Sequence, residues 1–303
     1  MGFQGAARAK INLFLHVGDK RADGFHPLQS LAVFPQAGDR LRAEKAAALS
    51  LTVDGPFAGS LSGEGDNLVL RAARALGPKD GQGAKLTLTK NLPVASGIGG
   101  GSADAAAALR ILSALWNLNL AEERLLEIAA QLGSDIPVCV ASQPRWMEGR
   151  GEILSPIASL PHLSMLLVNP GVAVPTKDVF AALKNRSGAH MKLPPGRFRD
   201  IADLLRFLDA SKNDLEEPAR RIQPVIGEVL TALLALPGTL FARMSGSGAT
   251  CFALFPDDES CARAAEILSA ASPGWWIHPT FVPECGLTHE EAGRDIGPTD
   301  QGL

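Results

Sequence analysis

Residues 93–108 read PVASGIGGGSADAAAA, with four glycines between positions 97 and 101 and an alanine-rich run after Ser102. Glycine lets the backbone turn so that successive N–H groups face one concavity, and alanine is the strongest helix former. A helix that begins directly behind such a loop adds unpaired N–H groups and the positive end of its dipole. The stretch therefore predicts an anion-binding loop, and the commonest anion in such loops is a phosphate.

Three interpretations of this loop can be compared. A P-loop ends in Gly-Lys-Ser/Thr, which is absent here. A dinucleotide-binding fingerprint fits at Gly97 and Gly99, with Glu122 about 20 residues further on, but Ser102 replaces the third glycine. The preceding residues 84–90 alternate apolar and polar side chains, which is typical of a half-exposed strand and not of a buried parallel one. A turn that only caps a helix is the third interpretation.

The composition limits the class of protein. A chain of 303 residues predicts two domains, and 46% hydrophobic with 20% charged residues is typical of a water-soluble globular protein. The net charge of −3, with no basic block, argues against nucleic acid as a main partner. Four cysteines without a Cys-x-x-Cys pair indicate reduced thiols in a cytoplasmic protein, and the scattered histidines predict no protein metal site. The apolar runs are too short to cross a membrane.

The pattern along the chain predicts a mixture of helices and strands. Strands are expected at residues 9–17, 28–34, 49–53, 84–89, 165–169 and 249–255. Helices are expected at 68–76, 102–115, 120–132, from about 134, and at 178–183, 204–207, 224–236 and 260–271. Prolines and glycines accumulate at 142–151. We therefore expect domains at 1–146 and 147–284, with a mobile polar tail at 285–303.

Three separated motifs together resemble the GHMP family of small-molecule kinases. They are AKINLFL at 9–15 with RADGFHPLQS at 21–30, the glycine-rich loop at 93–106, and RMSGSGA at 243–249. The resemblance runs from about residue 9 to residue 283. It implies an α+β fold with a ribosomal-protein-S5-like N-terminal domain, a ferredoxin-like C-terminal domain, and the active site between them.

The resemblance also implies a function. It is closest to the members that use ATP and Mg²⁺ to phosphorylate the tertiary 2-hydroxyl of a cytidine-diphosphate sugar alcohol, in the non-mevalonate route to isoprenoid precursors. The expected partner is that small molecule, with no nucleic acid or membrane, and the chain is expected to be a monomer or weak homodimer. The alternatives are a homoserine- or mevalonate-type kinase, a NAD-binding dehydrogenase, and a non-catalytic nucleotide-binding module.

Two residues are the catalytic candidates. Asp135 lies in an apolar stretch before Pro137, where we expect it to be buried. The resemblance makes it the base that takes the proton from the acceptor hydroxyl, whereas a helix N-cap is the ordinary role for such an aspartate. The resemblance places Lys10 beside Asp135, where it would stabilise negative charge during transfer; an exposed strand lysine is the alternative.

The resemblance assigns the remaining site residues to two ligands. For ATP they are Asn67 and the loop residues Pro93, Val94, Ala95, Ser96, Gly97, Ile98, Gly99, Gly100, Gly101, Ser102 and Ala103. For the acceptor they are Asn12, Phe25, His26, Thr176, Phe180 and Ser247. Phe25 and Phe180 are expected to cover the two faces of the cytosine ring, and His26 its polar edge. Two positions depart from the family pattern: Phe25 replaces a tyrosine, and Ala103 replaces a second serine beside Ser102, the candidate Mg²⁺ ligand.

Overall fold

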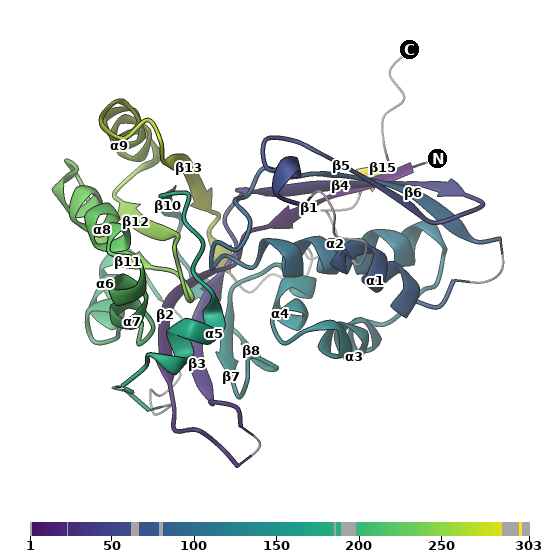
Figure 1. Ribbon diagram of the computed structural model, residues 1–303, viewed down its shortest axis with the longest axis horizontal. Helices are drawn as coiled ribbons and strands as arrows, with labels where there is room; N and C mark the ends of the chain where they lie inside the picture. The colour runs from purple at the N-terminus through teal and green to yellow at the C-terminus, as the bar shows by residue number, and fades with distance from the viewer. Residues whose placement is uncertain are drawn as a thin grey trace.

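The computed structural model describes residues 2–22, 24–61, 67–78, 81–184, 186–188, 198–286 and 297–298. Figure 1 shows three groups of strands: one sheet on the right above the helices between residues 68 and 141, one on the left beside the helices at 225–235 and 258–271, and a third between and below them. The mixture of sheets and helices confirms the predicted α+β class.

The first sheet carries the strand that leads into the glycine-rich loop. Its order is β15-β1-β4-β6-β5, and neighbouring strands pair antiparallel except β5 and β6, which are parallel. The strands are β1 (Gly2–Arg8), β4 (Gly38–Ala46), β5 (Ser50–Asp54), β6 (Gly83–Thr89) and β15 (Gly297–Pro298). A dinucleotide-binding domain needs a parallel sheet. The dehydrogenase alternative is therefore wrong.

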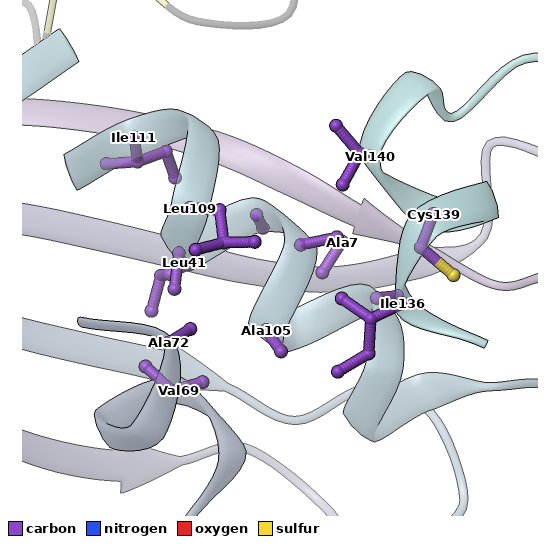
Figure 2. Packing of buried hydrophobic residues seen from close by; sticks show 14 of the residues in the cluster. Ala7, Leu41, Val69, Ala72, Ala105, Leu109, Ile111, Ile136, Cys139 and Val140 are labelled. Atoms are coloured by element: carbon purple, nitrogen blue, oxygen red, sulfur yellow. The ribbon is translucent and has the colours of Figure 1, made fainter. Parts of the chain in front are cut away.

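Four helices cover one face of this sheet. They are α1 (Leu68–Ala75), α2 (Gly100–Leu115), α3 (Glu122–Leu132) and α4 (Ile136–Ala141), with the short 3-10 helix η1 (Ala58–Leu61) before them. Figure 2 shows α2 enclosed by the sheet residue Leu41, by Val69 of α1 and by Ile136 of α4. The small alanines of α2 let its neighbours approach closely from all sides, and this packing holds the start of α2 in place.

The second sheet joins the two halves of the molecule. Its order is β2-β3-β7-β8, formed by β2 (Ile11–Val17), β3 (Leu28–Val33), β7 (Arg145–Glu148) and β8 (Ile153–Pro156). The domain boundary expected at residue 146 lies inside β7. Because β7 pairs with both β3 and β8, we propose that the boundary falls after Pro156 instead.

The third sheet has the order β11-β12-β10-β13 and is fully antiparallel. Its strands are β10 (Leu163–Asn169), β11 (Phe241–Met244), β12 (Cys251–Phe255) and β13 (Trp276–Val282). Alternate residues of β10 point to opposite faces. Leu166 and Val168 share a core with α8 (Val225–Ala235) and α9 (Asp258–Ala271), while Met165 and Leu167 share one with β2, β3 and α6 (Ile201–Asp209).

The remaining elements connect these layers. They are α5 (Thr176–Ala181), α7 (Glu216–Ile222), and the short pair β9 (Ser159–Leu160) and β14 (Cys285–Gly286). Of the expected tail, β14 pairs with β9 and β15 pairs with β1, while 287–296 and 299–303 lie outside the described residues. Nowhere in the described ranges does a helix combine the length and the apolar character needed to span a bilayer.

Candidate active site

A cleft of about 1210 Å³ lies between the glycine-rich loop, β2, the turn at 245–248 and α5. Drug-sized ligands occupy roughly 300–1,000 Å³, so this cleft has room for more than one ligand. It is lined by every candidate residue named above except Ile98 and Ala103. These two side chains are buried in the cores beside the loop, so only their backbone could reach ATP, and that contact stays a prediction.

The glycine-rich loop ends at the N-terminus of α2. Gly99 is the N-cap, in a left-handed conformation with φ of 64°, and it makes no side-chain cap hydrogen bond. The first N–H groups of a helix have no partner within the helix. Those of Gly100, Gly101 and Ser102 are therefore available to an anion, and all three residues line the cleft.

The loop packs directly against the Gly-Ser-Gly turn at 245–248. A Cβ on Gly97, whose φ is 76°, would lie 2.5 Å from the Gly248 carbonyl oxygen, so only glycine fits there. Just after the turn, the Thr250 N–H donates to Ser96 O at 3.1 Å, and the Lys10 N–H, directly before β2, donates to Ile98 O of the loop at 2.9 Å. This packing fixes the loop relative to β2, which carries Asn12.

Lys10 and Asp135 meet in the cleft although 125 positions separate them in the chain. The Lys10 Nζ lies 2.9 Å from the Asp135 carboxylate. The lysine stem passes beside the loop, because a Cβ on Gly99 would lie 3.4 Å from the Lys10 Cβ. The ammonium group is therefore held next to the helix N-terminus that would bind the phosphates.

Asp135 differs from the expectation in its exposure. Its side chain is 44% exposed, against 6% for Lys10, so the prediction that it is buried is wrong. The apolar residues after it belong to α4 and face the core, whereas Asp135 precedes the helix and faces the cleft. It occupies the N-cap position of α4 but makes no side-chain cap hydrogen bond. Its carboxylate is thus available to a ligand.

Arg110 of α2 supports α4 from its other end, a contact that sequence reasoning missed. One of its terminal nitrogens donates to the carbonyl oxygens of Cys139 and Val140, and the other donates to Ala6 O in β1, each at 2.9 Å. Carbonyl groups at the end of a helix lack partners within the helix. Arg110 therefore anchors α4, and with it Asp135, to the first sheet.

Three of the expected acceptor contacts lie on the same wall of the cleft. Asn12 donates to the Ser30 hydroxyl at 2.7 Å, which fixes its amide group. Thr176, the first residue of α5, and Ser247 share a hydroxyl–hydroxyl hydrogen bond of 2.8 Å. Asn12, Thr176 and Ser247 line the cleft, as predicted, and their contact with an acceptor stays a prediction.

The three rings expected to bind cytosine all line the cleft. His26 stacks on Phe180, with ring centroids 5.8 Å apart and an interplanar angle of 28°. Phe25, which precedes His26 in the chain, has 51% of its surface exposed. Phe180 therefore already has a ring on one face. The contact of each of the three rings with cytosine stays a prediction.

Asn67 has a structural role besides its predicted ATP contact. It is the N-cap of α1, and its carboxamide oxygen accepts the Val69 N–H at 2.9 Å. It also lines the cleft close to the loop. Its contact with ATP stays a prediction.

A buried cluster of charges lies beneath the start of α2, and sequence reasoning missed it. The Lys90 ammonium contacts the carboxylates of both Asp39 and Asp104, the latter at 2.8 Å. Asp39 also accepts the N–H groups of Asn91 and Leu92, which lead into the loop. Burial raises the pKa of Asp104 to about 8, against the attraction of Lys90. No local pattern reveals such a cluster, because its members come from different elements.

This cluster should be essential for stability. Replacing Lys90 with methionine leaves the Asp39 carboxylate buried without a counter-charge, and we expect it to lower the free energy of unfolding by about 3 kcal/mol. Replacing Asp104 with asparagine keeps the hydrogen bond to Lys90 and should cost much less. Urea unfolding of both variants at pH 7 measures the difference.

The raised pKa of Asp104 also makes the stability of the fold depend on pH. The pKa of Asp104 is raised in the folded chain, so the unfolded chain loses this proton first, and stability falls as the pH rises from about 4 toward 8. Asp104→Asn should flatten this part of the profile. An Asp104→Asn variant that loses as much stability as the wild type between pH 5.5 and 8.5 would contradict this assignment.

Asn213 was also missed, and it holds the Gly-Ser-Gly turn in place. Its amide group donates to the carbonyl oxygens of Met244 and Gly246, each at 2.8 Å, and its oxygen accepts the Leu215 N–H. The neighbouring Asp214 accepts the Val17 N–H at 2.8 Å. The signal in the sequence was the adjacent pair Asn213 and Asp214 before the apolar Leu215. If such polar side chains are buried, they must find hydrogen-bond partners in the fold.

Comparison with known proteins agrees with this geometry. Residues 67–143 match the model of the GHMP kinases N terminal domain, and residues 180–274 match that of the GHMP kinases C terminal domain. A 4-diphosphocytidyl-2-C-methyl-D-erythritol kinase from Parvibaculum lavamentivorans is 54% identical over 279 residues, which cover 90% of this chain and 95% of that protein. A kinase of the same name from Rhodopseudomonas palustris is 49% identical over 289 residues, covering 92% and 96%.

One solved structure supports the same family and another the same fold. A crystal structure of 4-(cytidine 5'-diphospho)-2C-methyl-D-erythritol kinase superposes with a TM-score of 0.74 at 33% identity, covering 92% of this chain and 99% of that one. The mevalonate kinase of L. major, solved with R-mevalonate, superposes with a TM-score of 0.67 at 17% identity, over 93% and 96% of the chains. The second likeness concerns the fold alone.

Proposed function

Since the chain belongs to the GHMP kinase family, we propose that it phosphorylates the 2-hydroxyl of 4-(cytidine 5'-diphospho)-2-C-methyl-D-erythritol, in the synthesis of isoprenoid precursors. It is an ATP-dependent kinase. The observation that carries the choice of acceptor is a single cleft, with the Lys10–Asp135 pair beside the glycine-rich loop and three aromatic rings further along. Relatives of that name share about half of the chain's residues.

Phosphoryl transfer needs the reactants to be aligned and the transferred charge to be stabilised. The N–H groups at the start of α2 would bind the triphosphate, and the Lys10 ammonium would lie near the transferred group. The acceptor hydroxyl oxygen attacks the γ-phosphorus, ADP leaves, and Asp135 takes the hydroxyl proton. Lys10 then has two tasks, which are to orient the Asp135 carboxylate and to stabilise phosphoryl oxygen charge.

Mg²⁺ would accompany ATP. Among the described residues, no three His, Cys, Asp or Glu side chains are grouped so that they could hold a metal ion. This fits an ion held mainly by phosphate oxygens and water, with the Ser102 hydroxyl as the candidate protein ligand. When bound, Mg²⁺ would neutralise phosphate charge during transfer.

The ring of His26 suggests how cytosine is chosen over uracil. Its Nδ1 lies 2.9 Å from the Gly18 carbonyl oxygen, which can only accept, so in the neutral ring Nδ1 carries the proton and Nε2 is an acceptor. Cytosine presents an amino donor at the position where uracil presents a carbonyl acceptor. An acceptor nitrogen therefore favours cytosine.

His26→Ala should narrow the preference for the cytidine substrate over its uridine counterpart. The loss of one hydrogen bond is worth about two- to tenfold in the ratio of the two kcat/KM values. His162→Ala serves as the control, because His162 lies on the surface and pairs with Asp258. A ratio that is unchanged in His26→Ala would show that another group reads the base.

The function itself can be tested with a panel of acceptors. ADP release is measured with the cytidine-diphosphate substrate, its uridine counterpart, homoserine and mevalonate. We expect by far the highest kcat/KM with the cytidine compound, and ³¹P NMR of its product should show one new phosphomonoester beside an intact diphosphate. Equal or faster phosphorylation of homoserine or mevalonate would replace this proposal with another member of the family.

The setting of the enzyme is proposed from its composition. A net charge of −3 and unpaired cysteines fit a cytoplasmic enzyme that acts on a small molecule without nucleic acid or membrane. We propose a monomer or weak homodimer, which sedimentation velocity would test.

A further inference from the structure

Arg150 lies at the aromatic end of the cleft, in the turn between β7 and β8. The centre of its guanidinium group lies 4.8 Å from the centroid of the Phe25 ring, which is within the range of a cation–π contact. No motif drew attention to this arginine, because its partner comes from a turn more than a hundred residues earlier in the chain.

The backbone around Arg150 is fixed toward Phe25. Gly149 and Gly151, on either side, have φ values of 70° and 107°, so the turn requires a conformation that glycine adopts easily. The Leu28 N–H donates to the Gly149 carbonyl oxygen at 2.6 Å, which ties this turn to the segment that carries Phe25. The Arg150 N–H also donates to the Glu152 carboxylate.

Phe25 is half exposed, and it lies in a connecting segment and not on a strand or helix. A contact such as that with Arg150 can therefore influence how its ring is oriented. Phe180, in contrast, belongs to α5 and stacks against His26. A ring that is already oriented binds a base more tightly, because less free energy is lost in ordering it when the ligand arrives.

We propose that Arg150 is a positioning residue for the acceptor: its guanidinium group packs on Phe25 and orients this ring as one wall of the cytosine site. The inference rests on the proposed function and adds a residue to it. Arg150 thereby affects acceptor binding through Phe25 and has no part in phosphoryl transfer.

A double-mutant cycle tests this role. Arg150→Met keeps an unbranched apolar stem and removes the cation, and we expect it to raise the KM for the cytidine substrate about two- to fivefold. The kcat and the KM for ATP should stay unchanged. In a Phe25→Ala background the same change should have no further effect, and Arg150→Lys, which keeps a cation over the ring, should restore most of the affinity. Arg263→Met, at an exposed ion pair on α9, is the control.

Charge offers a competing explanation that the experiment must separate. Lys20, Lys177 and Arg150 all line the cleft, so Arg150 could attract the substrate's diphosphate without acting on Phe25. Inhibition by cytidine, which has no phosphate, distinguishes the two. If Arg150 positions Phe25, then Arg150→Met should lower the affinity for cytidine and for the diphosphate substrate by the same factor. The inference would be overturned if Arg150→Met weakened the binding of phosphate-bearing ligands alone. It would also be overturned if the change raised the KM as much in the Phe25→Ala background as in wild type.

A spectroscopic measurement separates this inference from the kinase proposal. In a chain labelled with 4-fluorophenylalanine, Phe25→Leu identifies the Phe25 signal in the ¹⁹F NMR spectrum. Arg150→Met should move that signal, and Arg263→Met should not. An unmoved signal would overturn the role of Arg150 even in an active kinase, whereas a wild type that fails to phosphorylate the cytidine substrate would overturn the proposed function alone.

Discussion

Replacing Asp135 with asparagine should lower kcat between about a hundredfold and ten-thousandfold, the range expected for the loss of a general base. Asparagine has nearly the same shape but cannot take a proton from the acceptor hydroxyl. The affinity for ATP should hardly change, because the phosphates would be bound by the start of α2 and not by this side chain. Steady-state kinetics and an ATP titration of the folded variant measure both quantities.

A matched control comes from Asp200, another aspartate at a helix N-cap. Its side chain does cap its helix, since it accepts the Asp203 N–H at 2.8 Å. Asp200→Asn should leave turnover unchanged. If Asp135→Asn also kept near-normal turnover, Asp135 would be no more than the N-cap residue of α4.

Replacing Lys10 with methionine should remove turnover to a similar degree. Methionine fills much of the buried space of the lysine stem but offers no charge to Asp135 or to a phosphoryl group. The double variant with Asp135→Asn should lose much less than the product of the two single losses, because residues that act as a unit are strongly non-additive. The three kcat values, measured beside wild type, complete the cycle.

Lys85→Met is the control for Lys10→Met, because Lys85 is an exposed lysine on β6. It should leave kcat unchanged. Fully independent losses in Lys10→Met and Asp135→Asn would mean that the contact of 2.9 Å between these side chains has no part in transfer.

The parts of the fold that the sequence predicted are those with strong local signals. The start of α2 follows from its glycines and alanines, and α3 follows from its apolar face and the glycine after it. The strand β4 was missed because its sequence, GDRLRAEKA, is rich in charges, and only Leu41 and Ala43 show its buried face clearly. The strand β13 was also not predicted, because it contains Pro279. It lies at the edge of its sheet, where proline is tolerated.

The site was predictable where a motif marks it and not where distant segments create it. Residues alone left Lys10 and Asp135 as ordinary strand and cap residues, and only the family resemblance paired them. The exposure of Asp135 was misjudged because apolar neighbours in sequence do not reveal which side faces a cleft. The contacts of Lys90 and Arg150 were not predictable, because each joins segments separated along the chain.

A single-turnover measurement tests most directly whether the Lys10–Asp135 pair carries out the transfer. Wild type and Asp135→Asn, each in excess over the cytidine substrate and saturated with radiolabelled ATP, are quenched at successive times. The account predicts that the rate constant for forming the labelled phosphomonoester falls at least about a hundredfold in the variant, while ATP is bound with unchanged affinity. A transfer rate equal to that of wild type would contradict it and would assign the proton to a different group.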